Sequence, residues 1–319
     1  MIDLKNDNLL INKEVNENLE NILKRKVFSN GYIFYGPEGI GKKETAIKFT
    51  EEIFKQYSSN TNVKGKIIDN NHPDFLLIEP TILSNGNLRN RTEAESKKNN
   101  KEIIRIEQIR NIKIFLSQKS IESGKKIVLI VDAHLLNEAA SNCLLKTLEE
   151  PTNGLFILLT SRLNLLLDTI ISRCQLIRFK SFSYKQLDIF IRNSKDSSML
   201  NVDEKLNLKD FINIGNGSPG KILNDIKIWN ELSNEIKDNL DSLFSDNLTI
   251  LKISKIITEE LEIDQQVFLV NFIQNKYWKK TKNKTIIKTL ENLKVNLRGF
   301  IQPRLAWEVA LLKVAIENL

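Results

Sequence analysis

Short apolar runs alternate with helical patterns in the first half of the chain. Ahead of the first run, apolar residues recur at helical spacing, with Val15, Leu19 and Leu23 on one face. Strands that alternate with helices predict a parallel five-stranded sheet covered by helices, an α/β fold. The runs with the length and continuity of strands buried on both faces are residues 32–35, 75–78, 127–131, 156–159 and 176–179.

The pattern changes after residue 179, where the strand-like runs stop. Residues 181–222 form a small helical stretch that closes at a segment rich in glycine and proline, residues 215–220. From residue 223 to 319 the pattern is helical throughout. We therefore expect an α/β domain at 1–180, a small helical domain at 181–222 and an all-α domain at 223–319. The last helix should start after Pro303 and carry an apolar stripe of Leu305, Val309, Leu312 and Ile316.

A glycine-rich loop follows the first predicted strand and opens a helix. Residues 36–42 read Gly-Pro-Glu-Gly-Ile-Gly-Lys, which fits all but the last position of the phosphate-binding motif G-x-x-x-x-G-K-[S/T]. Backbone N–H groups near Gly36, Gly39 and Gly41 can approach a phosphate, and Lys42 can reach the outer phosphates of a nucleotide. The context predicts a nucleotide-binding loop rather than a chance glycine-rich turn.

Two positions that should support a magnesium ion carry other residues. The motif needs a hydroxyl after its lysine, but this chain has Lys43, and an ammonium group has no lone pair with which to bind a metal. P-loop ATPases also place an aspartate at the end of the third strand. We expect Val131 at that position, with Asp132 one place later; in the competing register Asp132 is itself the ligand. The first register predicts a nucleotide site without a metal and without hydrolysis.

Three motifs follow the loop in a fixed order. Residues 144–151 read Leu-Leu-Lys-Thr-Leu-Glu-Glu-Pro on a helix that Asn137 can cap, residues 156–160 read Phe-Ile-Leu-Leu-Thr, and residues 172–174 read Ser-Arg-Cys. This order resembles the AAA+ subunits of the replicative clamp loader, and residues 71–75, 217–220 and 302–308 fit as well. The resemblance implies an AAA+ module for the α/β domain, a lid for the small helical domain and an oligomerising collar for the all-α domain.

The resemblance also assigns roles to single residues. Arg173 looks like the family's arginine finger, which reaches the ATP of a neighbouring subunit and stabilises charge on the transferring phosphoryl group. The alternative is an arginine that complements the C-terminal dipole of a short helix capped by Asp168. Thr160 can serve as the polar residue at the end of the fourth strand. Gly220 stands where the family's motor subunits have a lid arginine, which weakens a further nucleotide contact.

The expected cofactors are few. ATP or ADP would bind without hydrolysis, if at all. Many clamp-loader relatives bind zinc through four cysteines between the first helix and the second strand, but residues 50–75 contain no cysteine, so we expect no zinc. The chain has two cysteines and two histidines, and their spacing is not that of a metal site.

Composition and charge narrow the class of protein only a little. No apolar run reaches the about 18 residues that a membrane span needs, and the first 14 residues lack an apolar signal core, so we expect a cytoplasmic protein with no membrane partner. The net charge of +7 permits contact with nucleic acid, although a bias toward Lys, Asn and Ile explains it equally well. The basic and aromatic segment 276–284 is more simply a solvated helix face than a DNA-binding surface. The polar segment 81–101 is expected to be a mobile surface insertion.

Together these features predict a non-motor clamp-loader subunit without catalysis of its own, within the larger replicative polymerase assembly. It would supply Arg173 in trans and help to load the sliding clamp onto primed DNA during replication. The implied partners are motor subunits and a delta-type subunit in a hetero-oligomeric ring, the sliding clamp, and primer–template DNA reached through the complex. The alternatives are an active ATP-hydrolysing motor subunit that tolerates Lys43 and Val131, and a stand-alone DNA-binding protein.

Overall fold

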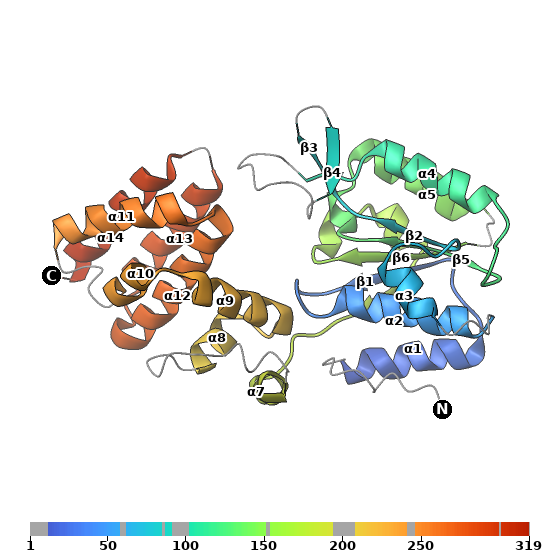
Figure 1. Cartoon of the computed structure of the whole chain (residues 1–319), viewed down its shortest axis with the longest axis horizontal. Coiled ribbons are helices and arrows are strands. Elements are labelled where there is room, and N and C mark those ends of the chain that lie inside the picture. The colour runs from blue at the N-terminus through green and yellow to red at the C-terminus, as the bar shows by residue number, and fades with distance from the viewer. Residues whose placement is uncertain are drawn as a thin grey trace. The chain divides into compact units, whose positions relative to one another are not determined.

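The computed structural model describes residues 12–57, 62–84, 87–90, 102–150, 154–193, 208–240, 246–299 and 301–318. The chain divides into two compact units, Met1–Gln186 and Leu187–Leu319, which are described separately here (Figure 1). The finer division of the helical part into a lid and a collar stays a prediction. The expectation of no export signal depends mainly on residues 1–11. These residues lie outside the described residues.

The first unit is built on a five-stranded sheet in which every paired neighbour is parallel, in the order β2-β5-β6-β1-β7. The predicted sheet is therefore confirmed, and each strand lies within two residues of its predicted bounds. The two strands β5 and β6 are buried along their whole length, which explains why their sequences are continuous apolar runs rather than alternating ones. The strands are β1 (Gly31–Tyr35), β2 (Phe75–Ile78), β5 (Lys126–Ile130), β6 (Gly154–Thr160) and β7 (Gln175–Arg178).

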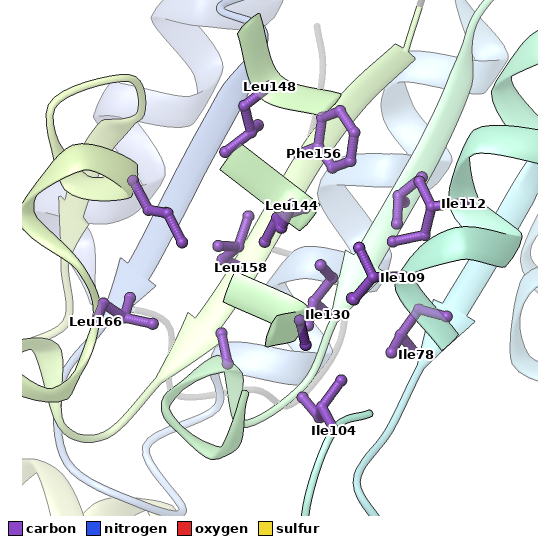
Figure 2. Close-up of a cluster of buried hydrophobic side chains, with 14 of the residues drawn as sticks. Ile78, Ile104, Ile109, Ile112, Ile130, Leu144, Leu148, Phe156, Leu158 and Leu166 are labelled. Atoms are coloured by element: carbon purple, nitrogen blue, oxygen red, sulfur yellow. The ribbon is translucent and has the colours of Figure 1, made fainter. Parts of the chain in front are cut away.

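Helices cover both faces of this sheet (Figure 1). The helices α1 (Lys13–Arg25), α2 (Lys42–Lys55) and α3 (Val63–Ile68) lie on one side, and α4 (Ile106–Ser117) and α5 (Glu138–Glu149) lie on the other. Figure 2 shows the core on the second side, where side chains of α4 and α5 meet those of the strands. The short helix α6 (Asp168–Ile171) adds Ile170 to this core. The residues that α1 buries are the predicted ones, Val15, Leu19, Ile22 and Leu23.

A small antiparallel hairpin interrupts the segment that the sequence predicts to be a surface insertion. It consists of β3 (Thr81–Ser84) and β4 (Asn87–Asn90), and Thr81 also exchanges two backbone hydrogen bonds with Ile103. The sequence did not indicate these two strands, because residues 81–84 and 87–90 do not show the apolar alternation of a half-buried strand, and the expected mobility of the insertion stays a prediction. The rest of that prediction falls on residues 85–86 and 91–101, which lie outside the described residues.

The second unit is helical in its described parts, as the sequence predicts. Its interior includes the fully buried Trp307, whose indole Nε1–H donates to Gln266 Oε1 at 2.9 Å. Pro303 is the first residue of the last helix, as expected from its fixed φ. The helices from the domain boundary onward are α7 (Tyr184–Asn193), α8 (Leu208–Ile214), α9 (Pro219–Glu231), α10 (Asn234–Asn239), α11 (Asn247–Glu260), α12 (Ile263–Thr281), α13 (Lys284–Arg298) and α14 (Pro303–Asn318).

Helix α14 is apolar on more than one face. Its inner face consists of the buried residues Ala306, Trp307, Ala310, Leu311 and Val314. The stripe identified in the sequence is a different one: Leu305 is 52% exposed, Val309 43% and Ile316 71%. These exposed apolar residues lie beside the buried face of the same helix, and they form a stripe that the described residues of the second unit leave uncovered.

The basic segment 276–284 forms the end of α12 and the start of α13. Tyr277 is buried, Trp278 is partly exposed, and the Lys279 ammonium pairs with Asp210. Part of this segment therefore packs within the second unit, and nothing in its geometry singles out DNA as a ligand.

Candidate functional site

The glycine-rich loop has the backbone of a phosphate-binding loop. It leaves the carboxyl end of β1 and enters the N-terminus of α2. Gly36, Gly39 and Gly41 all have positive φ, at 151°, 69° and 92°. At Gly36 a Cβ atom would lie 2.3 Å from the carbonyl oxygen of Phe179, so this position excludes any larger residue. The predicted loop residues therefore form a turn at a helix N-terminus, the geometry in which backbone N–H groups can approach a phosphate, and their binding of a nucleotide stays a prediction.

The loop lysine is held by the loop itself. The Lys42 ammonium donates to the carbonyl oxygen of Gly36 at 2.7 Å and to that of Pro37 at 2.6 Å. Burial lowers the pKa of Lys42 below its ordinary value, and nearby carboxylates, Asp132 first among them, oppose that shift. The ammonium group that would contact the phosphates of a nucleotide is thus hydrogen-bonded to two main-chain oxygens.

The residue after this lysine forms an ion pair. The Lys43 Nζ atom lies 2.6 Å from Oε1 of Glu79, which directly follows β2. In a P-loop ATPase a hydroxyl at this position ligates magnesium. Here the same position presents an ammonium group that is already paired with an acidic residue of the chain.

The carboxyl ends of β5 and β6 bring the other predicted residues close to the loop. Val131 lies just beyond β5, and its N–H donates to the carbonyl of Ile78, which extends the pairing of β5 with β2 by one residue. The residue at this position therefore carries an apolar side chain. Asp132 follows with φ of 50° and acts electrostatically on Lys42. The structure therefore places Gly36 to Lys43, Asp132 and Thr160 along the carboxyl edge of adjacent strands, the usual ligand position in parallel sheets.

The Thr160 hydroxyl already has partners. Its Oγ1 atom accepts the backbone N–H of Arg162 at 3.0 Å and lies 3.3 Å from Nδ1 of His134. Burial lowers the pKa of His134, which favours its neutral form, while Asp132 opposes the shift. The contact with Thr160 places His134 next to the residues predicted to bind a nucleotide, which the sequence did not indicate.

An open cavity of about 760 Å³ adjoins the loop within the first unit. It is lined by the loop start and by the segments that follow β6 and β7, including the side chains of Arg162 and Arg178. In the described part of the chain, no group of three or more His, Cys, Asp or Glu residues is placed to hold a metal ion. Likewise, no described helix is both long and apolar enough to cross a bilayer.

Arg173 lies away from the loop, in the turn that leads into the amino end of β7. Its Nη1 atom donates to the carbonyl oxygen of Thr169 in α6 at 2.9 Å, and its Nη2 atom donates to Glu149 Oε1 at 2.6 Å. The first bond is the one that the helix-dipole alternative predicts, and the second was not predicted. The side chain remains 38% exposed.

The expected cap at Asp168 is wrong. The N-cap of α6 is Leu167, which has extended backbone and makes no side-chain capping bond, and Asp168 is the first helical residue. Its carboxylate contributes only a negative charge near the helix N-terminus. By contrast, Asn137 does cap α5, since its Oδ1 atom accepts the N–H of Ala140 at 2.8 Å.

Cys174 packs the turn that carries Arg173 against the start of β1. A Cβ atom on Gly31, the first residue of β1, would lie 2.6 Å from the Cys174 sulfur, so the thiol occupies the space that a glycine leaves. Burial raises the pKa of this thiol to about 11, which keeps it protonated and unreactive at neutral pH. The cysteine next to Arg173 therefore has a packing role.

The segment 71–75 forms a buried polar cluster on the amino side of the sheet. The Asp74 carboxylate accepts the backbone N–H groups of Ile121, Glu122 and Ser123, each at 2.8 Å. His72 Nδ1 accepts the N–H of Asp74 at 3.1 Å, and its Nε2 atom lies 3.3 Å from the Ser123 hydroxyl. Because this imidazole bonds to a backbone N–H rather than to the carboxylate, the cluster is not a catalytic triad. It holds the loop before β5.

Comparisons with known proteins agree with this architecture. Residues 11–183 match the family described as DNA polymerase III, delta subunit, and residues 194–314 match the cyanobacterial DNA polymerase III delta prime C-terminal domain. The chain is 32% identical over 177 residues to DNA polymerase III subunit delta' of Bacillus subtilis, covering 53% of this chain and 48% of the relative. It is also 32% identical over 157 residues to the delta' subunit of Pseudomonas aeruginosa, covering 47% of this chain and 43% of the relative. These alignments span about half the length of the curated relatives.

A solved structure supports the fold over nearly the whole length. The DNA polymerase III gamma subunit-related protein of Thermotoga maritima has a TM-score of 0.50 and 17% identity, and the match covers 94% of this chain and 98% of that one. Such a likeness concerns the fold alone. The expected AAA+ module with a helical C-terminal part is confirmed, as is the resemblance to clamp-loader subunits of the delta-prime type. Since the first family match spans more than half of its residues, this chain belongs to the DNA polymerase III delta subunit family.

Proposed function

We propose that this chain is a non-motor, delta-prime-type subunit of a replicative clamp loader, which helps to load a sliding clamp onto primed DNA. Family membership supports the clamp-loader part of this proposal. The observation that carries the non-motor part is the ion pair between Lys43 and Glu79, at the position where a motor subunit would bind magnesium.

The remaining loop contacts support a site without hydrolysis. Lys42 is satisfied by two carbonyl groups of its own loop, Thr160 is engaged by Arg162 and His134, and Val131 offers no metal ligand. Gly220, at the position where the family's motor subunits carry an arginine, lies in the first turn of α9, and the following Lys221 donates to the carbonyl of Ile214. The pocket thus binds ATP or ADP without turning it over, if it binds them at all.

Arg173 supplies what the chain's own site lacks. A guanidinium has five N–H donors, so the bonds to Thr169 and Glu149 leave donors for a further anion. We assign this anion to the phosphoryl group of ATP bound by the neighbouring motor subunit. Removal of an arginine finger in related GTPase systems lowers the rate by roughly three to five decades.

The all-α part offers a surface for assembly. The exposed stripe of Leu305, Val309 and Ile316 on α14 is suited to packing against a helix of another subunit. We assign it to the collar of the ring, which would hold motor subunits and a delta-type subunit. The sliding clamp and primer–template DNA would be reached through that assembly, in the cytoplasm.

The test is a loader reconstituted with this chain carrying Arg173→Ala. We expect loss of the DNA-stimulated ATP hydrolysis at the adjoining motor site and slower clamp loading, with assembly of the complex intact. The matched control is Arg110→Ala, because Arg110 is also an exposed arginine of the first unit but lies on α4, outside the cavity lining and the turn that carries Arg173. If the Arg173 variant loads clamps and hydrolyses ATP as the parent does, the proposed finger is refuted.

A further inference from the structure

The guanidinium of Arg173 is held at two points by two different helices. Glu149 Oε1 accepts from Nη2 at 2.6 Å, and the Thr169 carbonyl accepts from Nη1 at 2.9 Å. Ser172 Oγ lies 3.5 Å from Nη1, at the limit of a hydrogen bond. Two anchors on opposite nitrogens fix the plane of the guanidinium as well as its position.

Both anchors stand on buried parts of the fold. Glu149 is the last residue of α5, directly after the buried Leu148, and Thr169 precedes the fully buried Ile170 of α6. The next residue in the chain, Cys174, packs against Gly31 at the start of β1. The long arginine side chain is therefore the flexible part of this arrangement, and its surroundings are rigid.

We propose that Glu149 is a positioning residue for the arginine finger. Its carboxylate keeps the guanidinium in one orientation at the surface, so that the finger meets a neighbour's phosphoryl group without first giving up many rotamers. A long side chain loses considerable conformational freedom when it is fixed, and catalytic groups act best when that ordering precedes the reaction. This inference rests on the proposed role of Arg173.

The pair is suited to positioning rather than to locking the finger away. Both side chains are substantially exposed, Arg173 at 38% and Glu149 at 47%, and ion pairs of this kind are weak and readily rearranged in water. The carboxylate also contacts only one guanidinium nitrogen, which leaves the Nε–H and further N–H groups for phosphoryl oxygens.

The neighbouring residue provides a matched control. Glu150 follows Glu149 directly and is also exposed, but its Oε1 atom pairs with the Lys113 ammonium at 2.9 Å instead of with Arg173. A change at Glu150 thus removes the same charge from the same helix end without touching the finger.

The experiment compares Glu149→Gln with Glu150→Gln in a reconstituted loader. Glutamine keeps the size and one acceptor oxygen but removes the charge. At saturating ATP, we expect Glu149→Gln to slow the DNA-triggered release of phosphate at the adjoining site by about threefold to tenfold. The KM for ATP and the assembly of the complex should stay unchanged, and Glu150→Gln should match the parent.

The same assay with Arg173→Ala distinguishes the finger role of Arg173 from the positioning role of Glu149. If Arg173→Ala has no effect, the proposed finger itself fails. If Arg173→Ala abolishes release at that site while Glu149→Gln equals or exceeds the parent rate, only the positioning role of Glu149 is overturned. A second readout is side-chain NMR of Arg173 in the isolated chain, where Glu149→Gln should speed hydrogen exchange of the Nη2 protons that the carboxylate accepts; an unchanged exchange rate also contradicts the proposal.

Discussion

The Lys43 ammonium lies 2.6 Å from the Glu79 carboxylate, at the point where the phosphate-binding motif normally presents a hydroxyl to magnesium. The two residues are 36 positions apart in the chain and come from the loop after β1 and the end of β2. A divalent cation at this point would have to displace a positive charge that the chain provides itself. The ion pair is thus a direct obstacle to metal binding, beyond the loss of a ligand.

Restoring two metal ligands should restore magnesium dependence. We expect the double variant Lys43→Thr with Val131→Asp to bind ATP at least about tenfold more tightly with magnesium than with EDTA, a difference of about 1.4 kcal/mol. The parent chain should show no such difference in calorimetric titrations. Magnesium-dependent ATP turnover by the parent, abolished by Lys42→Ala, would instead support the motor alternative.

Gly31 should resist substitution because of the Cys174 sulfur. We expect Gly31→Ala to lower the free energy of unfolding by about 1–3 kcal/mol, since its Cβ atom would lie 2.6 Å from that sulfur. Gly299→Ala is the control, as its Cβ atom would meet only ordinary contacts at 3.5 Å. Urea unfolding measures both. Adding Cys174→Ala to Gly31→Ala should recover part of the loss, and a fully additive double variant would argue against this contact.

Acid should destabilise the first unit through His72. Burial lowers the pKa of His72 below its ordinary value, so the unfolded chain takes up this proton at a higher pH than the folded chain. The full free energy of unfolding is therefore present above the ordinary histidine pKa of about 6.5, decreases as pH falls from there towards the lowered pKa, by up to about 1.4 kcal/mol for each pH unit, and levels off below the lowered pKa.

Urea titrations between pH 7.5 and 5 measure this slope. Burial also lowers the pKa of His134, so both histidines contribute to it. His72→Gln should make the slope shallower by one proton, whatever its effect on the absolute free energy. An identical slope in this variant would contradict the prediction, because it would show that His72 binds its proton equally well in the folded and the unfolded chain.

The exposed stripe of α14 should matter for assembly and not for folding. Val309 is 43% exposed, so Val309→Glu should change the melting temperature little but reduce co-purification with the motor subunits. Val295→Glu, at an even more exposed valine of α13, tests whether any loss of surface apolarity has the same effect. Equal binding by Val309→Glu and the parent would rule out this stripe as the collar contact.

The sheet could be predicted from the sequence because each of its strands is a run of consecutive, mostly apolar residues. The run at 127–130 is apolar throughout and is a strand buried on both faces, whereas the mixed sequences of the β3–β4 hairpin carry no such signal. The loop is likewise a local motif. The partners of its charged residues are not local: Glu149 is 24 positions from Arg173 in the chain, and only the packing of α5 beside α6 brings them together.

The wrong cap at Asp168 has the same origin. Asp168 has the residue type of a helix cap, but the helix begins one position earlier, so that Leu167 takes the capping place. The spacing of the α14 stripe correctly predicts a helix, but it does not tell which apolar face is buried, and the neighbouring residues of the same helix form the core. In both cases packing with other parts of the chain decides between adjacent positions.

Strand β1 connects the glycine-rich loop with the turn that carries Arg173. Its carboxyl end leads into Gly36 and the loop, while Gly31 at its amino end supports the turn that carries Arg173. Between them its pairing with β6 and β7 is unbroken. A change in the loop at one end of such a strand leaves the packing at the opposite end unaltered, so the two ends can diverge independently while the strand between them stays the same.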